Sequence, residues 1–211
     1  MDIQKLVKHI SNRTPTILGS KNFSKYAVLL PLVQIKGEYH ILFEVRSLQL
    51  RRQPGEVCFP GGRVDHSDED ERYTAVRETS EELGITKNSI HHISQLDYMI
   101  SPFGTIIYPF VGFIKNYEDI QVNPSEVEEI FTVPLSFLLQ TKPEIFQVSY
   151  KIEPERDFPF HHIAGGEKYN WQLRNMEECF YYYEDKVIWG LTAKILKHFM
   201  EMIEESREDL P

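Results

Sequence analysis

The sequence predicts an α/β fold in which helices flank a mixed β-sheet. Two apolar, β-rich runs come first and a well-bounded helix follows them; further β-rich runs and an amphipathic helix complete the chain. Strands and helices do not alternate regularly, so the pattern does not favour a doubly wound parallel sheet. With 211 residues, the chain lies near the usual length of one domain. We therefore expect a single domain over residues 1–211.

The first two β-rich runs predict a hairpin. Residues 26–35 are apolar, Lys36-Gly37 makes a turn, and residues 38–46 form the second run. A third short strand is expected at 57–59. It ends at Pro60-Gly61-Gly62, because proline and glycine do not continue regular pairing.

A helix is predicted between residues 67 and 84. Ser67 and Asp68 are candidate N-caps, the first turn is acidic, and Gly84 suits the C′ position. Its buried stripe is expected to contain Tyr73, Val76, Thr79 and Leu83, which recur at helical spacing.

The remaining elements are predicted from the same periodicities. We expect a long surface loop at 153–178 and terminal helices that pack on the domain. The predicted strands are 94–101, 105–114, 145–152 and 179–183, and the predicted helices are 1–12, 135–140 and 187–205.

Composition narrows the class of protein. The net charge of −9 argues against non-specific nucleic-acid binding, which depends on Lys and Arg, and it suits a site that holds cations. Cys58 and Cys179 lack the spacing of a disulfide framework or zinc site, so free thiols in a reducing compartment are expected. Neither a signal peptide nor a membrane-spanning run is recognised. We expect a cytoplasmic protein without a membrane partner, and a homodimer stays open.

Three glutamates of the central helix share one face. Glu78, Glu81 and Glu82 stand at positions i, i+3 and i+4, and such crowding destabilises a helix unless a cation is bound. An oxygen-rich site suits Mg²⁺ or Mn²⁺. The Gly62 turn can bring a backbone carbonyl close to the same ions, and Arg77 can pair with the acidic cluster. Taken alone, such a charged run is also typical of a solvated helix face.

The stretch 62–85 as a whole resembles the Nudix box, Gly-x5-Glu-x7-Arg-Glu-U-x-Glu-Glu-x-Gly-U with U apolar. Thr79 replaces the usual aliphatic residue, and one extra residue between Gly62 and Arg77 leaves either Asp68 or Glu69 in the early acidic position. The resemblance implies a Nudix α/β/α sandwich with a catalytic loop–helix–loop.

By the same resemblance, Glu78 and Glu82 are metal ligands together with Gly62, and Glu81 is a third ligand or the base for water. Arg77 is then catalytic as the partner of this acidic cluster. Metal ions so held would neutralise a diphosphate, orient a water for in-line attack and stabilise the leaving oxygen.

An upstream motif narrows the expected substrate. Arg46-Ser47, Arg51, Gly55 and Phe59-Pro60-Gly61-Gly62 are similar to the extra motif of Nudix coenzyme A pyrophosphatases, roughly Leu-Leu-Thr-x-Arg-Ser, then Arg, Gly and Phe-Pro-Gly-Gly. Phe43-Glu44-Val45 does not reproduce its opening.

This second resemblance implies that Arg46, Arg51, Gly55 and Gly61 contact the substrate, and arginine suits bidentate phosphate recognition. The arginines could instead solubilise a loop or pair with the acidic helix. Arg52 matches no motif position.

Other candidates carry less weight. In a segment that is similar to the same family, Glu126 or Glu129 is a candidate general base or extra ligand, and an ordinary surface acid is the alternative. Trp189 is expected in the core, and Cys58 is expected to be an inert buried thiol. The pairs His91-His92 and His161-His162 are expected at the surface rather than at a metal site.

The resulting hypothesis is a hydrolase of coenzyme A or acyl-coenzyme A that uses Mg²⁺ or Mn²⁺, with this small molecule as its substrate and without a nucleic-acid or membrane partner. Its products would be adenosine 3′,5′-bisphosphate and (acyl-)4′-phosphopantetheine. The alternatives are a Nudix hydrolase of another nucleoside diphosphate derivative, such as ADP-ribose or a dinucleotide, and a non-catalytic nucleotide-binding module.

Overall fold

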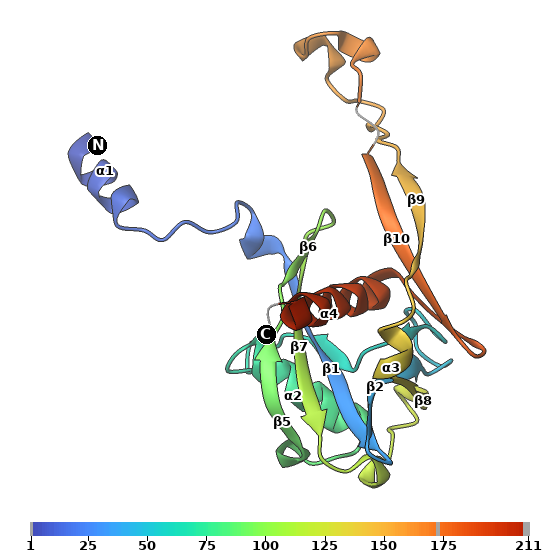
Figure 1. The fold of residues 1–211 in the computed structure, drawn as a ribbon. Coiled ribbons are helices and arrows are strands. Elements are labelled where there is room, and N and C mark those ends of the chain that lie inside the picture. The colour runs from blue at the N-terminus through green and yellow to red at the C-terminus, as the bar shows by residue number, and fades with distance from the viewer. Residues whose placement is uncertain (1, 172–173, 209–211) are drawn as a thin grey trace.

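The computed structural model describes residues 2–171 and 174–208, which form two β-sheets and four α-helices (Figure 1). The helices are α1 (Ile3–Ser11), α2 (Glu71–Glu82), α3 (Leu135–Leu138) and α4 (Gly190–Glu208). The large sheet contains β1 (Ser24–Ile35), β2 (Glu38–Arg46), β3 (Val57–Cys58), β4 (Gly61–Arg63), β5 (Ile90–Gln95), β6 (Met99–Ser101), β7 (Thr105–Ile114) and β8 (Val127–Pro134). The small sheet contains β9 (Glu144–Tyr150), β10 (Arg174–Tyr183) and β11 (Lys186–Trp189).

The large sheet is mixed, as predicted. Its main path runs β3-β2-β1-β7-β5, in which β1 and β7 are parallel and the other neighbours are antiparallel. β8 lies along the other edge of β2, and β4 pairs with the first half of β1. The predicted hairpin of β1 and β2 is confirmed, with Ile35 opposite Glu38 around the Lys36-Gly37 turn.

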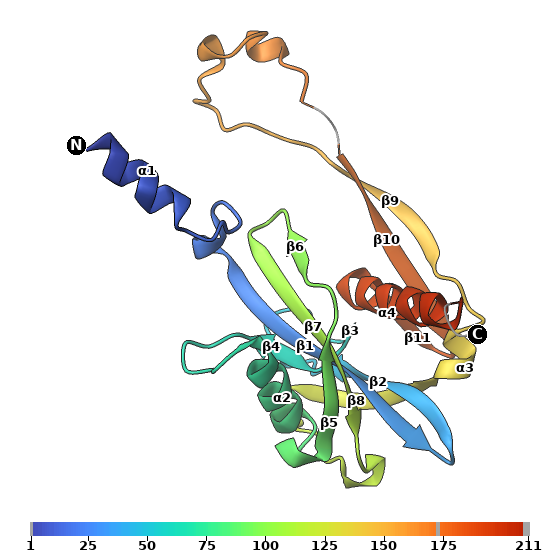
Figure 2. The same ribbon diagram turned by 60° about the vertical axis from the view of Figure 1, so that its left-hand side comes forward.

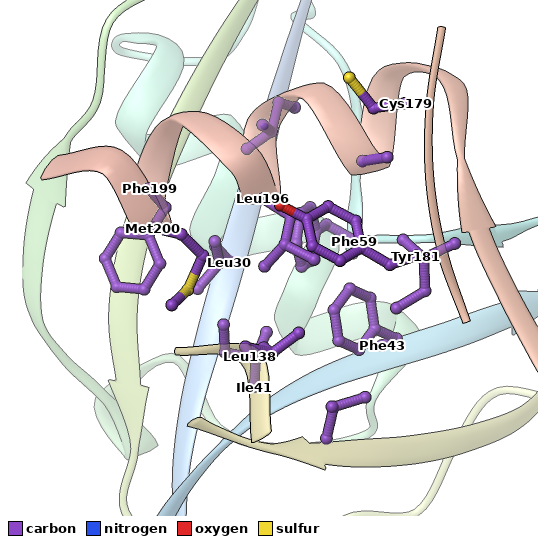
Figure 3. Packing of buried hydrophobic residues seen from close by; sticks show 14 of the residues in the cluster. Leu30, Ile41, Phe43, Phe59, Leu138, Cys179, Tyr181, Leu196, Phe199 and Met200 are labelled. Carbon is purple, nitrogen blue, oxygen red and sulfur yellow. The ribbon is translucent and has the colours of Figure 1, made fainter. Parts of the chain in front are cut away.

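Helices cover both faces of this sheet (Figure 2). Successive side chains of a strand point to opposite faces, so Leu29 packs in the cluster under α2 and Leu30 packs in the cluster under α4. Burial of each such leucine contributes roughly 1.5–3 kcal/mol. Figure 3 shows Leu196, Phe199 and Met200 of α4 packed over Leu30. The predicted α/β/α sandwich is confirmed.

The last helix begins later than predicted. Residues 186–189 form β11, which pairs antiparallel with β10, and α4 starts at Gly190. Val187 and Trp189 are exposed while Ile188 is fully buried, which is the alternation of a strand. Gly190 has a positive φ of 62°, and this breaks the strand before the helix.

The region after β4 also differs in detail from the prediction. The strand expected at 94–101 is two strands, β5 and β6, separated by Leu96–Tyr98. The loop expected at 153–178 ends earlier, because β10 begins at Arg174 and pairs with all of β9. Part of this loop, residues 172 and 173, lies outside the described residues.

β9 and β10 form a ribbon that projects from the sandwich, and α1 projects separately (Figures 1 and 2). Six of the seven residues of β9 are exposed, among them Phe146 and Val148. None of the residues of α1, all of which are described, is buried. The structure therefore places α1 off the domain, whereas we expected it to pack there; its apolar residues Ile3 and Val7 are exposed. Within the described part of the chain, no helix is long and apolar enough to span a bilayer.

Candidate active site

The helix α2 begins at Glu71, because Asp70 is its N-cap. The Oδ1 atom of Asp70 accepts a hydrogen bond from the backbone N–H of Tyr73 at 2.6 Å. The predicted caps Ser67 and Asp68 are therefore wrong. Asp68 instead accepts from the hydroxyl of Thr74 at 2.8 Å and from the backbone N–H of Asp65 at 3.0 Å, so the chain turns here before the helix starts.

Asp68 binds Arg77 through both carboxylate oxygens. Arg77 Nε donates to Oδ1 and a terminal nitrogen donates to Oδ2, each at 3.0 Å. Only 2% of the Asp68 side chain is exposed, and the Arg77 hydrogen bonds hold its pKa well below the usual range. Glu69 is exposed. Of the two residues left open for the early acidic position, the structure brings Asp68 to Arg77.

Arg77 also bridges two of the three helix glutamates. It donates to Glu78 Oε1 at 2.9 Å and to Glu81 Oε2 at 3.2 Å. Glu78 lies directly over Gly62, so closely that a Cβ atom at Gly62 would collide with its carboxylate. Burial raises the pKa of Glu78 despite the opposing effect of Arg77. Glu81 is exposed and lies at the edge of the site.

Glu82 is the most deeply placed of the helix glutamates. It is 5% exposed, and its Oε2 accepts a hydrogen bond from the backbone N–H of Gly61 at 2.8 Å. Burial is the main cause of its strongly raised pKa, and the charges of Glu44, Glu78 and Glu126 add to the shift. A cation bound beside Glu82 would relieve both effects.

The loop that follows β7 brings Glu126 to this group. The backbone N–H of Gln121 donates to Leu83 O at 2.9 Å and that of Asn123 donates to Glu82 O at 2.8 Å, which ties the loop to the end of α2. Glu126 O in turn accepts from the backbone N–H of Ser47 at 2.8 Å. Gly84 is required here, because a Cβ atom would collide with the carbonyl of Gln121. The predicted C′ role of Gly84 is confirmed by its φ of 63°.

Glu129, the other candidate acid, forms an ion pair with Lys186. The structure thus separates the two acids left open by the sequence. Glu129 lies beside β11, whereas Glu126 follows the loop bonded to the end of α2, and its charge raises the pKa of Glu78 and Glu82. Thr79, the departure from the aliphatic consensus, is fully buried and donates its hydroxyl to Ala75 O at 2.7 Å. That bond satisfies the extra polar group inside the core.

The sequence motifs did not identify Glu44. This residue of β2 is only 1% exposed, and Cys58 Sγ donates to its Oε1 at 3.3 Å. Burial raises the pKa of Glu44 to about 7. The only feature of the sequence that distinguishes Glu44 is a mismatch, because Phe43-Glu44-Val45 does not reproduce the opening of the expected motif. Burial raises the pKa of the Cys58 thiol as well, which keeps it protonated and fits the expected inert role.

The donor set suits a hard divalent cation, because it consists of carboxylates that disfavour one another's charge, together with a buried carboxylate oxygen of Glu44 that lacks a partner. Over residues 2–171 and 174–208, however, no three acidic, histidine or cysteine side chains converge closely enough to enclose an ion. Glu78 is engaged by Arg77 and Glu82 by Gly61, so cation binding has to compete with these contacts.

The loop from Arg46 to Glu56, which we call the arginine loop, is joined to the Glu126 segment by the hydrogen bond from Ser47 N–H to Glu126 O. Arg46 and Gly55 close it, since Gly55 N–H donates to Arg46 O and Arg46 N–H donates to Glu56 O, both at 2.9 Å. Gly55 has a positive φ of 74°, a conformation that favours glycine. Arg51 and Arg52 are exposed at the tip of the loop, and Arg46 is half-buried.

A hollow of about 430 Å³ lies beside this loop, on the side of β2 away from α2. Trp189 is 42% exposed there and stacks on Phe180, with ring centroids 5.8 Å apart. The expectation that Trp189 is a core residue is therefore wrong. The lining residues are Val45, Pro54, Gly55, Glu56, Val57, Phe180, Asp185, Lys186, Val187 and Trp189.

The paired histidines lie outside this site. His91 and His92 belong to β5 and pack against each other and Phe113, and His161 and His162 are exposed in the long loop.

Comparison with known proteins places these features in a family context. The profile described as NUDIX domain matches residues 24–153. The chain is 38% identical over 138 residues to Peroxisomal coenzyme A diphosphatase NUDT7 of Mus musculus, an alignment that covers 65% of this chain and 58% of that protein. It is 31% identical over 180 residues to Mitochondrial coenzyme A diphosphatase NUDT8 of Homo sapiens, covering 84% of this chain and 68% of that protein.

A solved structure supports the same fold. The crystal structure of a MutT/nudix family protein from Enterococcus faecalis superimposes with a TM-score of 0.52 at 16% identity, covering 97% of this chain and 70% of that one. This likeness concerns the fold alone.

Proposed function

Because the chain belongs to the Nudix family, we propose that it is a metal-dependent pyrophosphohydrolase that cleaves the diphosphate of coenzyme A or acyl-coenzyme A. The single observation that carries this proposal is the joining of two motifs. The carboxylates of Glu78 and Glu82 lie beside the Gly61-Gly62 turn, and the arginine loop is joined to the Glu126 segment by the bond from Ser47 N–H to Glu126 O. The carboxylate motif supports the type of reaction, and the arginine motif supports the class of substrate.

The acidic residues have distinct roles in the proposed mechanism. Glu78 and Glu82 would hold Mg²⁺ or Mn²⁺ with the backbone of Gly62, and the bound ion supplies charge neutralisation of the diphosphate and activation of water. Glu81 or Glu126 is the proposed base that removes the proton of the attacking water. Arg77 keeps Glu78 and Glu81 on one side of the helix through its hydrogen bonds.

The substrate would lie along the arginine loop. Arg46 and Arg51 are proposed to bind its phosphates, with Gly55 and Gly61 allowing close approach of the backbone. The names of NUDT7 and NUDT8 assign coenzyme A diphosphatase activity to those relatives, and we extend that substrate to this chain. The products would be adenosine 3′,5′-bisphosphate and (acyl-)4′-phosphopantetheine.

The location and assembly of the protein stay predictions. The names of two relatives place those proteins in peroxisomes and in mitochondria. The cytoplasmic location of this protein therefore rests on its sequence alone and stays a prediction. A homodimer likewise stays a prediction that a mass measurement in solution can check.

The proposal is tested by hydrolysis assays of the purified protein with coenzyme A, acyl-coenzyme A esters, ADP-ribose and diadenosine polyphosphates, with and without Mg²⁺ or Mn²⁺. We expect cleavage of the coenzyme A compounds that stops when a chelator removes the metal. Glu82→Gln should lower kcat by at least about 100-fold with its fold intact, because it withdraws a charged metal ligand. Cleavage of ADP-ribose but not of coenzyme A would overturn the substrate, and metal-independent turnover would overturn the mechanism.

A further inference from the structure

Glu44 is a buried carboxyl group with one oxygen left unpaired. Its Oε1 accepts from Cys58 Sγ, but Oε2 is buried without a hydrogen-bond partner among the residues that the structure describes. Leaving such a group unsatisfied in the interior costs free energy, and a full negative charge costs more. The Oε2 atom of Glu44 therefore needs a binding partner from outside the protein chain.

The orientation of Glu44 follows from the strand that carries it. Leu42 packs in the cluster under α2 and Phe43 packs in the cluster under α4. Alternation along β2 then places Glu44 on the face of α2, which is the face of Glu82. The electrostatic effects agree, because the charge of Glu44 acts on Glu82 and the charge of Glu126 acts on Glu44.

The surrounding groups leave Glu44 without a neutralising partner. Cys58 is a thiol that keeps its proton, so it donates one weak hydrogen bond and brings no positive charge. Arg46 is the nearby cation, yet it forms no hydrogen bond with Glu44 within the described chain. In the coenzyme A pyrophosphatase pattern given above, the position of Glu44 is threonine, so this carboxylate is an addition to the motif.

We propose that Glu44 is a further carboxylate of the cation site, in which its unpaired oxygen binds a divalent ion together with Glu82. The described side chains do not enclose an ion by themselves, so ion binding has to bring these two carboxylates together. The two groups come from β2 and from α2, so the ion would join two separate segments of the chain. Carboxylate oxygens of this kind suit Mg²⁺ or Mn²⁺. This inference rests on the proposed function, which supplies the metal requirement.

The test is calorimetric titration of Mn²⁺ into the wild-type protein and into Glu44→Gln, Glu82→Gln and Glu128→Gln. Gln keeps the shape of the side chain and removes its charge, and Glu128 is an exposed acid of β8 that serves as the matched control. We expect Glu44→Gln to weaken Mn²⁺ binding at least about tenfold or to abolish one bound ion, since even groups that only support a metal ligand contribute 10- to 100-fold. Glu128→Gln should bind as the wild type does.

A second readout separates a cation ligand from a structural acid. In chelator, Glu44→Gln should have a higher Tm than the wild type, because it removes a buried unpaired charge, and added Mn²⁺ should raise its Tm by less. Should Glu44→Gln bind Mn²⁺ with the affinity and stoichiometry of the wild type, the inference is overturned and Glu44 serves the fold alone.

The two proposals fail in different ways. If the wild type hydrolyses coenzyme A with Mg²⁺ and Glu44→Gln still binds ions normally, only the proposed role of Glu44 is overturned. If the wild type binds neither Mg²⁺ nor Mn²⁺, the metal-dependent mechanism and the role of Glu44 are both overturned. Should Glu44→Gln not fold, as judged by circular dichroism, Glu44→Thr carries the same prediction with the residue that the motif uses.

Discussion

Arg77 contacts three carboxylates at once, those of Asp68, Glu78 and Glu81. These contacts explain how an acidic helix face can fold before a cation is bound. The pair with Asp68 is the most deeply buried of the three, so it should contribute more to stability than the pair with the exposed Glu81.

Removal of the Asp68 charge should therefore destabilise the protein. We expect Asp68→Asn to lower the free energy of unfolding by about 2–3 kcal/mol at pH 7, because Arg77 loses its bidentate partner. The pKa of Asp68 is depressed in the folded state, so its contribution is present above the unfolded pKa of about 3.9 and is lost as the pH falls through the folded value. Urea unfolding at several pH values measures both effects.

The matched control is Glu69→Gln, which removes the neighbouring exposed charge and should change stability by less than about 0.5 kcal/mol. The difference between wild type and Asp68→Asn should shrink from about pH 4 downward. A difference that stays constant down to about pH 2, or an equal effect of Glu69→Gln, would contradict the role assigned to Asp68.

At this scale the sequence could predict the glutamates but not their surroundings. Helical spacing alone places Glu78 and Glu82 on one face, and the choice between Asp68 and Glu69 needed the path of the turn before α2. Glu44 was beyond prediction, since alternation in β2 cannot say that a polar residue is buried until the position of α2 is known.

Among the elements, the short strand β4 positions the site through two glycines with different constraints. A Cβ atom at Gly61 would collide with the backbone of Ala27 and Val28 in β1, whereas one at Gly62 would collide with the side chain of Glu78. A backbone cannot move aside as a carboxylate can. The two positions should therefore respond differently to the same substitution.

We expect Gly61→Ala to lower stability by about 2–3 kcal/mol through overpacking. Gly62→Ala should lower stability less, yet reduce kcat about tenfold or more, because it displaces a proposed metal ligand. Thermal unfolding and coenzyme A hydrolysis of both variants provide the check. Equal loss of stability in the two variants would show that the contact of Gly62 with Glu78 has no special role.

The hairpin of β10 and β11 should contribute to substrate binding through the hollow that it lines. Trp189 is partly exposed and lines the same hollow as Gly55. Trp189→Ala should therefore raise KM for coenzyme A about three- to tenfold and leave kcat within about twofold, because it removes ground-state and transition-state binding equally. Tyr182→Ala, an exposed aromatic of β10 that does not line the hollow, is the control. An unchanged KM for Trp189→Ala would show that the hollow does not contribute to substrate binding.

The strand β11 of this hairpin could not be distinguished from the start of a helix in the sequence. Ile188 and Leu191 fit a helical period as well as a strand that leads into a helix, and the left-handed conformation of Gly190 decides between them. Short apolar runs do not distinguish the two structures, because burial on one side satisfies both.

For the whole molecule, the sandwich should be independent of α1. Removal of residues 1–16 should change Tm by less than about 2 °C and leave kcat unchanged, because none of the described residues in α1 is buried. Leu196→Ala in α4, by contrast, should cost about 2–5 kcal/mol, since Leu196 is fully buried. Calorimetry of both proteins tests this contrast, and a large loss of stability on truncation would show that α1 packs on the domain.

At this largest scale the sequence predicted the two helical layers and the mixed sheet correctly. The projecting ribbon could not be predicted, since the residues of β9 predict a strand but do not say whether it is covered, and most of them are exposed. Burial depends on which element lies over a strand, and that is a property of the whole chain.

The parallel pairing of β1 with β7 also affects how the protein reaches its native state. Ser24 lies opposite Thr105, so joining these strands closes a loop that contains Glu44, α2 and the glycine turn. Contacts so distant in sequence form slowly, and the acidic centre should assemble late in folding. Doubling the length of such a loop adds only about 0.6 kcal/mol of closure entropy, so the extra residue between Gly62 and Arg77 is tolerated easily.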